Sequence, residues 1–249
     1  MNRDILDEKV RFEFSKICEN FGLKNIYTLD QKIGSTNFTE NGHHIFKFSL
    51  SQIITTGVQK NRFEINILGS CSIKNVETFW IEYKPLVSPK MLVKDLSENE
   101  PLHYPATYNF SYSLERVLDK FPSNVNGKWL SFEISESGIA EFKEVANFII
   151  ENDYTDQIKN PLSIEKLDSD VNSTIEIGKL ENYLIHKDGF IYRRMIIAKL
   201  NKNQLFDEIC DYHRSAFPQY LEIAKQPGNE FLKNIPEVFE KVYAKLRGL

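Results

Sequence analysis

The sequence predicts an α+β fold, with an N-terminal helix, a mainly antiparallel sheet and then a C-terminal block of helices. Three observations support this prediction. Apolar residues recur at helical spacing over about residues 4–21, alternate with polar residues in segments between 46 and 134, and return to helical spacing from about 139 onward. Strands and helices therefore come in blocks, whereas a doubly wound parallel sheet would need them to alternate along the chain.

The first helix is predicted over about residues 4–21, with Gly22 as its stop. Alternation then predicts a block of half-buried strands. They lie at 46–50, at 63–67, within NVETFWIEYKPL, within TYNFSYS and at 127–134. The first two strands are expected to be joined by the stretch TTGVQKN, which contains Gly57, as a hairpin or a longer loop. The proline-rich segment 85–105 is expected to be a long irregular connection.

The C-terminal helices are predicted from stripes of apolar residues and from their end signals. The first runs through 139–149 and is capped by Ser135 or Ser137, and the second runs through 177–184 and ends near Gly189. The third is FIYRRMIIAKL. The fourth follows Asn203 and breaks at Pro218, and the last has Pro236 in its first turn. Apolar density falls over 152–175. We therefore expect a helix-and-sheet lobe at 1–151 and a helical lobe at 152–249, packed as one body.

Composition and charge narrow the function classes. The chain of 249 residues has 31 basic and 35 acidic residues, a net charge of −4, and 41% hydrophobic residues, which is typical of a globular protein. No apolar run reaches the ~18–20 residues of a membrane span, and the opening MNRDILDEKV is too charged for a secretion signal. Three scattered cysteines fit reduced thiols, so we expect a cytoplasmic protein without a membrane partner. The acidic balance disfavours nucleic acid as a partner.

Two pairs of residues suggest metal or nucleophile chemistry at first sight. His43 and His44 are adjacent at the start of a strand, where neighbouring side chains point to opposite faces, so they cannot chelate one metal together. Cys210 and His213 share a face of a predicted helix. A zinc site needs three or four ligands, and the sequence does not identify the others, so a buried cysteine beside an amphipathic histidine is the favoured explanation of this pair. We predict no metal site here.

The most specific catalytic hypothesis rests on WIEYK. On a strand, Glu82 and Lys84 would point to the same side, and Glu64 lies on an earlier strand. Metal-dependent nucleases place an acidic residue on one strand and an E-x-K on the next, where the carboxylates hold Mg²⁺ and the lysine steadies the attacking water. E-x-K is also a common arrangement on any solvated strand face.

Candidate binding residues come from two further segments. Arg193 and Arg194 in YRRM would suit a phosphate or partner, although a solvated helix face would explain them too. Tyr108 and Tyr112 share one face of a strand with Phe110, where they would stack on a ligand or pack beneath helices. Motifs for P-loop nucleotidases, dinucleotide oxidoreductases, zincins and α/β-hydrolases are absent from the sequence, which argues against these enzyme classes.

The order NFGLKN, HHIFKFSLSQ, RFEINILG, KWLSFEI, RRMIIAKL resembles a broad group of uncharacterised bacterial α+β proteins, classed as a domain of unknown function. The resemblance spans about residues 4–225 and carries over no functional residue. It implies a place among toxin-immunity or phage-defence proteins.

We interpret the chain as a non-catalytic cytoplasmic protein-binding module, such as an immunity or defence-associated protein, without a cofactor. Its expected partner is another protein, for example a basic toxin steered by acidic surfaces. The alternative is a nuclease or phosphodiesterase that uses Mg²⁺ with Glu64, Glu82 and Lys84. A third option is a small-ligand module at Tyr108 and Tyr112, which requires a concave pocket. Whether the protein is an enzyme stays open, and the missing catalytic motifs favour a binding role.

Overall fold

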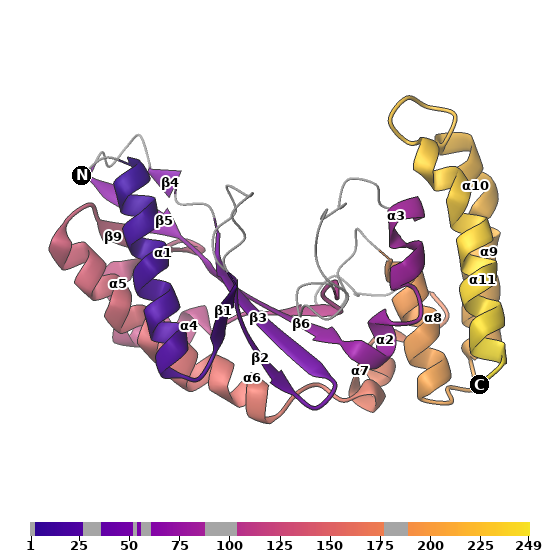
Figure 1. Cartoon of the computed structure of the whole chain (residues 1–249), viewed down its shortest axis with the longest axis horizontal. Helices are drawn as coiled ribbons and strands as arrows, with labels where there is room; N and C mark the ends of the chain where they lie inside the picture. Colours follow the sequence, from indigo (N-terminus) through magenta and orange to yellow (C-terminus); the bar gives the residue numbers. More distant parts are fainter. Residues whose placement is uncertain (1–2, 27–35, 52–53, 56–60, 88–103, 177–188) are drawn as a thin grey trace. The chain divides into compact units, whose positions relative to one another are not determined.

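The computed structural model describes residues 3–26, 36–51, 54–55, 61–87, 104–176 and 189–249. Within these residues a helix comes first, antiparallel strands follow, and helices make up the C-terminal part (Figure 1), which confirms the predicted α+β class. The chain divides into two compact units. Unit 1 comprises Met1–Cys71 and Phe110–Pro161, and unit 2 comprises Ser72–Asn109 and Leu162–Leu249. These units interleave along the chain, whereas composition predicts a single division after residue 151.

Unit 1 begins with the predicted N-terminal helix, α1 (Arg3–Asn20). Its buried stripe includes Leu6, Val10 and Phe14, which recur every four residues. Gly22 follows with a φ of 78°, a left-handed conformation that glycine adopts without strain, and this confirms the predicted stop. The helix packs beside α5 (Glu136–Ile149), as Figure 1 shows.

The larger sheet has five strands in the order β1-β2-β3-β6-β7. They are β1 (Lys24–Ile26), β2 (Thr36–Asn41), β3 (His44–Leu50), β6 (Ile67–Ile73) and β7 (Tyr108–Phe110). Strand β3 confirms the prediction at 46–50 and buries Phe46 and Phe48. Its hairpin partner is β2, which the alternation did not predict. The two-residue loop is Gly42-His43, and a glycine with a positive φ, here 58°, at the first loop position is typical of a type II′ hairpin turn and could have indicated this strand.

The smaller sheet has four strands in the order β4-β5-β9-β8. They are β4 (Ile54–Thr55), β5 (Arg62–Ile65), β9 (Trp129–Glu133) and β8 (Val125–Asn126). Strand β9 confirms the predicted last strand, and it pairs with β5 so that Phe63 lies opposite Phe132. The segment predicted as one strand at 63–67 is divided between the two sheets, because β5 ends at Ile65 and β6 begins at Ile67. Gly57, in the expected connection, lies outside the described residues.

Short helices complete unit 1. They are α4 (Leu114–Lys120), the 3₁₀ turn η3 (Pro122–Asn124), the π-helical segment η4 (Ile150–Tyr154) and α6 (Thr155–Lys159), besides α5. Helix α5 confirms the predicted helix, and Ser135 is its cap, since its hydroxyl accepts a hydrogen bond of 3.1 Å from the N–H of Gly138.

Gly138→Ala is expected to destabilise unit 1 by roughly 1–3 kcal/mol, which is typical of a residue forced into occupied space. A Cβ at this position would overlap the backbone carbonyl of Glu133 at the end of β9, and that backbone cannot yield without disturbing the strand. Urea unfolding would measure the change. Gly248→Ala is the control, because the added carbon would lie 3.5 Å from its nearest neighbour, an ordinary contact. Equal losses for the two variants would contradict the steric argument.

Unit 2 is built around α8 (Phe190–Leu200), which is buried from Tyr192 to Ala198. The remaining helices of unit 2 are α2 (Lys74–Glu77), η1 (Ile81–Tyr83), α3 (Lys84–Val87), α7 (Ile164–Val171), α9 (Phe206–Ser215), α10 (Phe217–Ile223), η6 (Glu230–Asn234) and α11 (Ile235–Arg247). Helix α8 contacts α2, α7, α9 and α11. The break before Pro218 and the last helix with Pro236 in its first turn are confirmed, whereas the helix predicted at 177–184 lies outside the described residues.

The strand predicted within NVETFWIEYKPL is wrong. This segment forms α2, η1 and α3 instead. Its buried apolar residues are Val76, Trp80 and Val87, and their spacing of four and seven residues is that of a helix and not of a strand. Alternating letters alone suggested the strand. The helical turn also points Glu77 into the core, where its carboxylate meets several hydrogen-bond donors.

Candidate functional site

The three residues of the nuclease hypothesis lie on different kinds of element. Glu64 is on β5 in unit 1, where it is buried and accepts a 2.6 Å hydrogen bond from Asn126. Glu82 and Lys84 are in unit 2, on η1 and at the start of α3. A spacing of two residues places side chains on opposite sides of a helical turn, so the strand-borne E-x-K expected at Glu82 and Lys84 does not form.

Glu82 is held instead by the last helix of unit 2. Its carboxylate accepts a 2.9 Å hydrogen bond from the ammonium group of Lys245, and this bond lowers the pKa of Glu82. Both side chains are about half exposed, so the pair is a surface ion pair of small energetic value.

The aromatic residues proposed for ligand stacking are inside the protein. In unit 2, Tyr108 is fully buried. In unit 1, Tyr112 is also buried and its hydroxyl donates a 2.8 Å hydrogen bond to Asn66, while burial raises its pKa to about 12. Phe110 packs edge-on against Phe48, with 5.7 Å between ring centroids. These rings are packed within the protein, which is the second of the two outcomes that the sequence predicts for them.

Arg193 and Arg194 on α8 are buried as well, so neither lies on a solvated helix face. The guanidinium of Arg193 donates two hydrogen bonds to Glu77, of 2.8 and 3.0 Å. The same carboxylate accepts hydrogen bonds from the indole of Trp80 at 2.9 Å and the hydroxyl of Thr107 at 2.6 Å. This ion pair therefore organises the core of unit 2.

Arg194 takes part in a second buried network. It donates to the carbonyl of Val171 and to the side chain of Asn172 at 2.9 Å. Asn172 in turn donates a 2.7 Å hydrogen bond to Asp168 on α7. The second oxygen of Asp168 accepts hydrogen bonds of 2.8 Å from both Asn201 and Asn203. The network thus fixes the loop that joins α8 to α9.

Cys210 and His213 share the buried face of α9, as their spacing predicts. Burial raises the pKa of the Cys210 thiol to about 12, so the thiol stays protonated near neutral pH and is a poor nucleophile or ligand. Burial and the nearby charge of Arg194 lower the pKa of His213 to about 4. Among the described residues, no three histidine, cysteine or acidic side chains gather where they could bind a metal ion.

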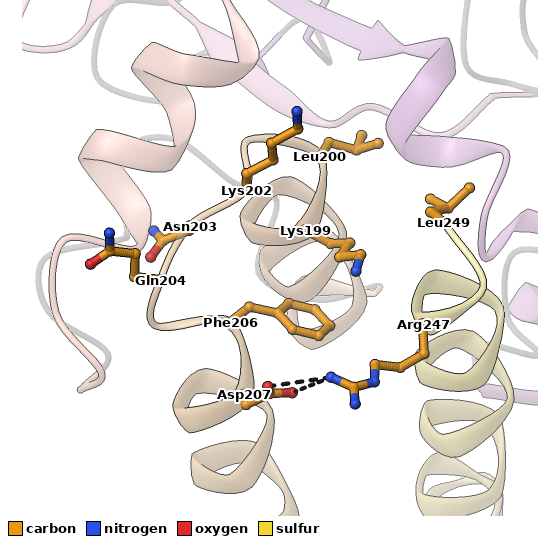
Figure 2. A pocket seen from close by; sticks show the side chains of 9 residues that line it. All are labelled: Lys199, Leu200, Lys202, Asn203, Gln204, Phe206, Asp207, Arg247 and Leu249. Atoms are coloured by element: carbon orange, nitrogen blue, oxygen red, sulfur yellow. Dashed lines mark hydrogen bonds and ion pairs between the residues drawn. The ribbon is translucent and has the colours of Figure 1, made fainter.

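The structure reveals a pocket in unit 2 that sequence reasoning missed. It has a volume of about 430 Å³ and lies between the end of α8, the start of α9 and the end of α11 (Figure 2). We call it the cationic pocket. Its lining residues are Lys199, Leu200, Lys202, Asn203, Gln204, Phe206, Asp207, Arg247 and Leu249.

The loop at one side of the cationic pocket is a well-defined helix stop. The N–H of Asn203 donates to the carbonyl of Ala198, and the N–H of Lys202 donates to that of Lys199, which is the Schellman pattern. Lys202 occupies the position where glycine is usual and has a φ of 55°. A side chain in this left-handed conformation costs roughly 1–2 kcal/mol, and the hydrogen bonds from Asn201 and Asn203 to Asp168 help to hold it.

The charge of this pocket is opposite in sign to that of the whole chain. Among the side chains that line the pocket, Lys199, Lys202 and Arg247 contribute three positive charges and Asp207 one negative charge, an excess of two positive side-chain charges in a chain of net charge −4. Figure 2 shows Arg247 reaching from α11 toward Asp207, and 3.4 Å separates its guanidinium from the carboxylate. Within the described part of the chain, neither Lys199 nor Lys202 forms an ion pair.

The cationic pocket has the chemistry of a binding site. Ammonium and guanidinium groups donate hydrogen bonds and attract anions, but they do not accept a proton near neutral pH. The one side-chain carboxylate that lines the pocket, that of Asp207, is already engaged by Arg247 and by the hydroxyl of Tyr243 at 3.1 Å. The run AKLNKNQLFD carries two of the lysines and could have marked the site, but Arg247 comes from 40 residues further on.

None of the described helices combines the length and the apolar composition that crossing a membrane requires. Comparison of the chain with family models, with curated proteins and with solved structures found no match.

Proposed function

We propose that this chain is a non-catalytic protein-binding module whose cationic pocket receives acidic side chains of a partner protein. The observation that carries this proposal is the gathering of Lys199, Lys202 and Arg247 around a pocket of about 430 Å³ whose lining includes a single side-chain carboxylate, that of Asp207. The like charges of this group repel one another, and a partner's carboxylates would relieve that repulsion. An immunity-type inhibitor that holds an acidic loop of its target is one protein of this kind.

The charge of the pocket and the geometry of its hydrogen-bond donors both favour acidic side chains as the bound group. Arginine presents a planar set of donors that matches a carboxylate, while the two lysines act as point charges beside it. The pocket's excess of positive charge would also speed the encounter with an acidic segment. A basic toxin, expected from the net charge of the chain, would have to bind elsewhere on the surface.

Lys199→Met together with Arg247→Met is expected to weaken binding of a dye-labelled oligoglutamate peptide about tenfold, measured by fluorescence anisotropy at low salt. Two charge contacts that remain open to solvent and are worth together about 1.4 kcal/mol correspond to this factor. The same double variant should lose the partner that wild-type protein captures from its native lysate. Unfolding curves would establish that the variant retains its fold.

Lys225→Met is the matched control, because Lys225 is an exposed lysine of unit 2 that pairs with Glu222 and does not line the pocket. It should bind the peptide as wild type does, within about twofold. Equal binding by all three proteins, or none by wild type, would contradict the proposal. Mg²⁺-dependent cleavage of DNA or RNA that Glu82→Ala abolishes would contradict the non-catalytic part of it.

A further inference from the structure

We infer that Asp207 competes with the partner for Arg247. When no partner is bound, Asp207 pairs with Arg247, and this pairing lowers the affinity of the cationic pocket for acidic side chains. This inference rests on the proposed function and adds to it the element that sets the strength of binding. It predicts that removing one negative charge from the pocket improves binding.

The contact between Asp207 and Arg247 is loose. Both carboxylate oxygens lie 3.4 Å from the same guanidinium nitrogen, Nη1. Charge-assisted hydrogen bonds of this kind are usually 2.7–2.9 Å long. The two side chains are 59% and 56% exposed, so solvent screens their attraction. A carboxylate that approaches from solvent can therefore form a shorter bond with Arg247 than Asp207 does.

Asp207 itself is held in place from other directions. The hydroxyl of Tyr243 donates a 3.1 Å hydrogen bond to Oδ1 of Asp207, and the ring of Tyr243 stacks on Phe206 at 5.8 Å. Asp207 also lies in the first turn of α9, where the helix dipole stabilises a carboxylate. Arg247 is in the last turn of α11, and its guanidinium carbon lies 5.9 Å from the centroid of the Tyr243 ring, a long cation–π contact that a flexible side chain can leave. On binding, we expect Arg247 to change partner while Asp207 stays.

A fixed carboxylate in the pocket acts against a partner in two ways. It attracts Arg247 away from the incoming group, and it repels that group directly, because both carry negative charge. With Asp207 neutralised, the excess of positive charge among the lining residues rises from two to three. The affinity of the pocket is therefore set by this residue as well as by its cations.

The test compares Asp207→Asn with wild type, using the same dye-labelled oligoglutamate peptide and fluorescence anisotropy. Asparagine keeps the shape and is tolerated near a helix start, so the fold should be retained. We expect the peptide to bind about threefold to tenfold more tightly to Asp207→Asn. Unchanged or weaker binding, with wild-type binding intact, overturns the inference and leaves the proposed function standing.

Asp211→Asn is the matched control for the loss of one negative charge. Asp211 lies one turn further along α9, pairs with Arg214 at 2.8 Å and does not line the pocket. Its replacement should change the affinity by less than about twofold. An equal gain in both variants would show that net charge alone acts, and would overturn the inference.

Comparing Asp207→Asn/Arg247→Met with Arg247→Met alone identifies the route of the effect. If Asp207 acts mainly by occupying Arg247, replacing Asp207 gives little gain in affinity on the Arg247→Met background. A gain that persists in full would overturn the competition for Arg247. Absence of peptide binding by wild type and by every variant would overturn the proposed function, and this inference with it.

Discussion

Glu77→Ala is expected to destabilise unit 2 by about 3–5 kcal/mol, the loss typical of a buried ion pair that is deprived of one partner. Glu77 and Arg193 are 0% and 1% exposed. Without the carboxylate, the guanidinium would stay in the core as an uncompensated charge, and the donors of Trp80 and Thr107 would lose their acceptor. Urea or guanidinium unfolding, followed by tryptophan fluorescence, would measure the change.

The same segment offers a matched control in Glu82→Ala. Glu82 also loses a basic partner, Lys245, but both groups are about half exposed, so the expected loss is only about 0–1 kcal/mol. A combined Glu77→Leu and Arg193→Met variant should be more stable than Glu77→Ala, because an apolar pair leaves no buried charge. Comparable losses for Glu77→Ala and Glu82→Ala would show that the buried pair contributes little.

Acidification from pH 7 to pH 4 is expected to cost unit 2 about 3 kcal/mol through His213 alone. The pKa of this histidine falls from 6.5 to about 4 on folding, because it is buried and faces the charge of Arg194. Its other neighbours are the rings of Phe190, Tyr212 and Phe239. Its Nε2 has no hydrogen-bond partner among the described residues, so no group there stabilises the protonated form.

The direction in which stability changes with pH follows from proton binding. Between pH 6.5 and 4 the unfolded chain binds a proton at residue 213 that the folded chain does not, so stability falls as the pH falls. His213→Leu removes this titration, and its stability relative to wild type should improve progressively over the same interval. An NMR titration in which the His213 ring protons shift near pH 6.5 in the folded protein would contradict the prediction.

Local periodicity was sufficient for much of the fold. Helix α1 and its stop at Gly22, the strands β3 and β9, the cap at Ser135 and the last helix with Pro236 all depend on residues within a few positions of one another. Such features are set by side-chain alternation, glycine conformation and capping, which a sequence displays directly. The α+β class follows from their order along the chain.

Local periodicity was misleading where tertiary burial overrode it. Apolar and polar residues alternate in part of NVETFWIEYKPL, yet the segment forms helical turns. These turns bury Val76, Trp80 and the carboxylate of Glu77 together inside unit 2. Arg193 and Arg194 look like surface residues by composition alone. Their burial depends on acceptors elsewhere in the chain, and Glu77 is 116 residues away from Arg193.

The amino-acid sequence by itself therefore determined much of the architecture, that is, which segments form helices or strands and in what order they follow one another. Only the tertiary structure determined which polar side chains contact one another. The buried pair of Glu77 and Arg193, the loop held by Asp168, and the approach of Arg247 to Asp207 each join residues that are 33 or more positions apart. Charge and hydrogen bonding act through distance in space, and a linear pattern does not contain that distance.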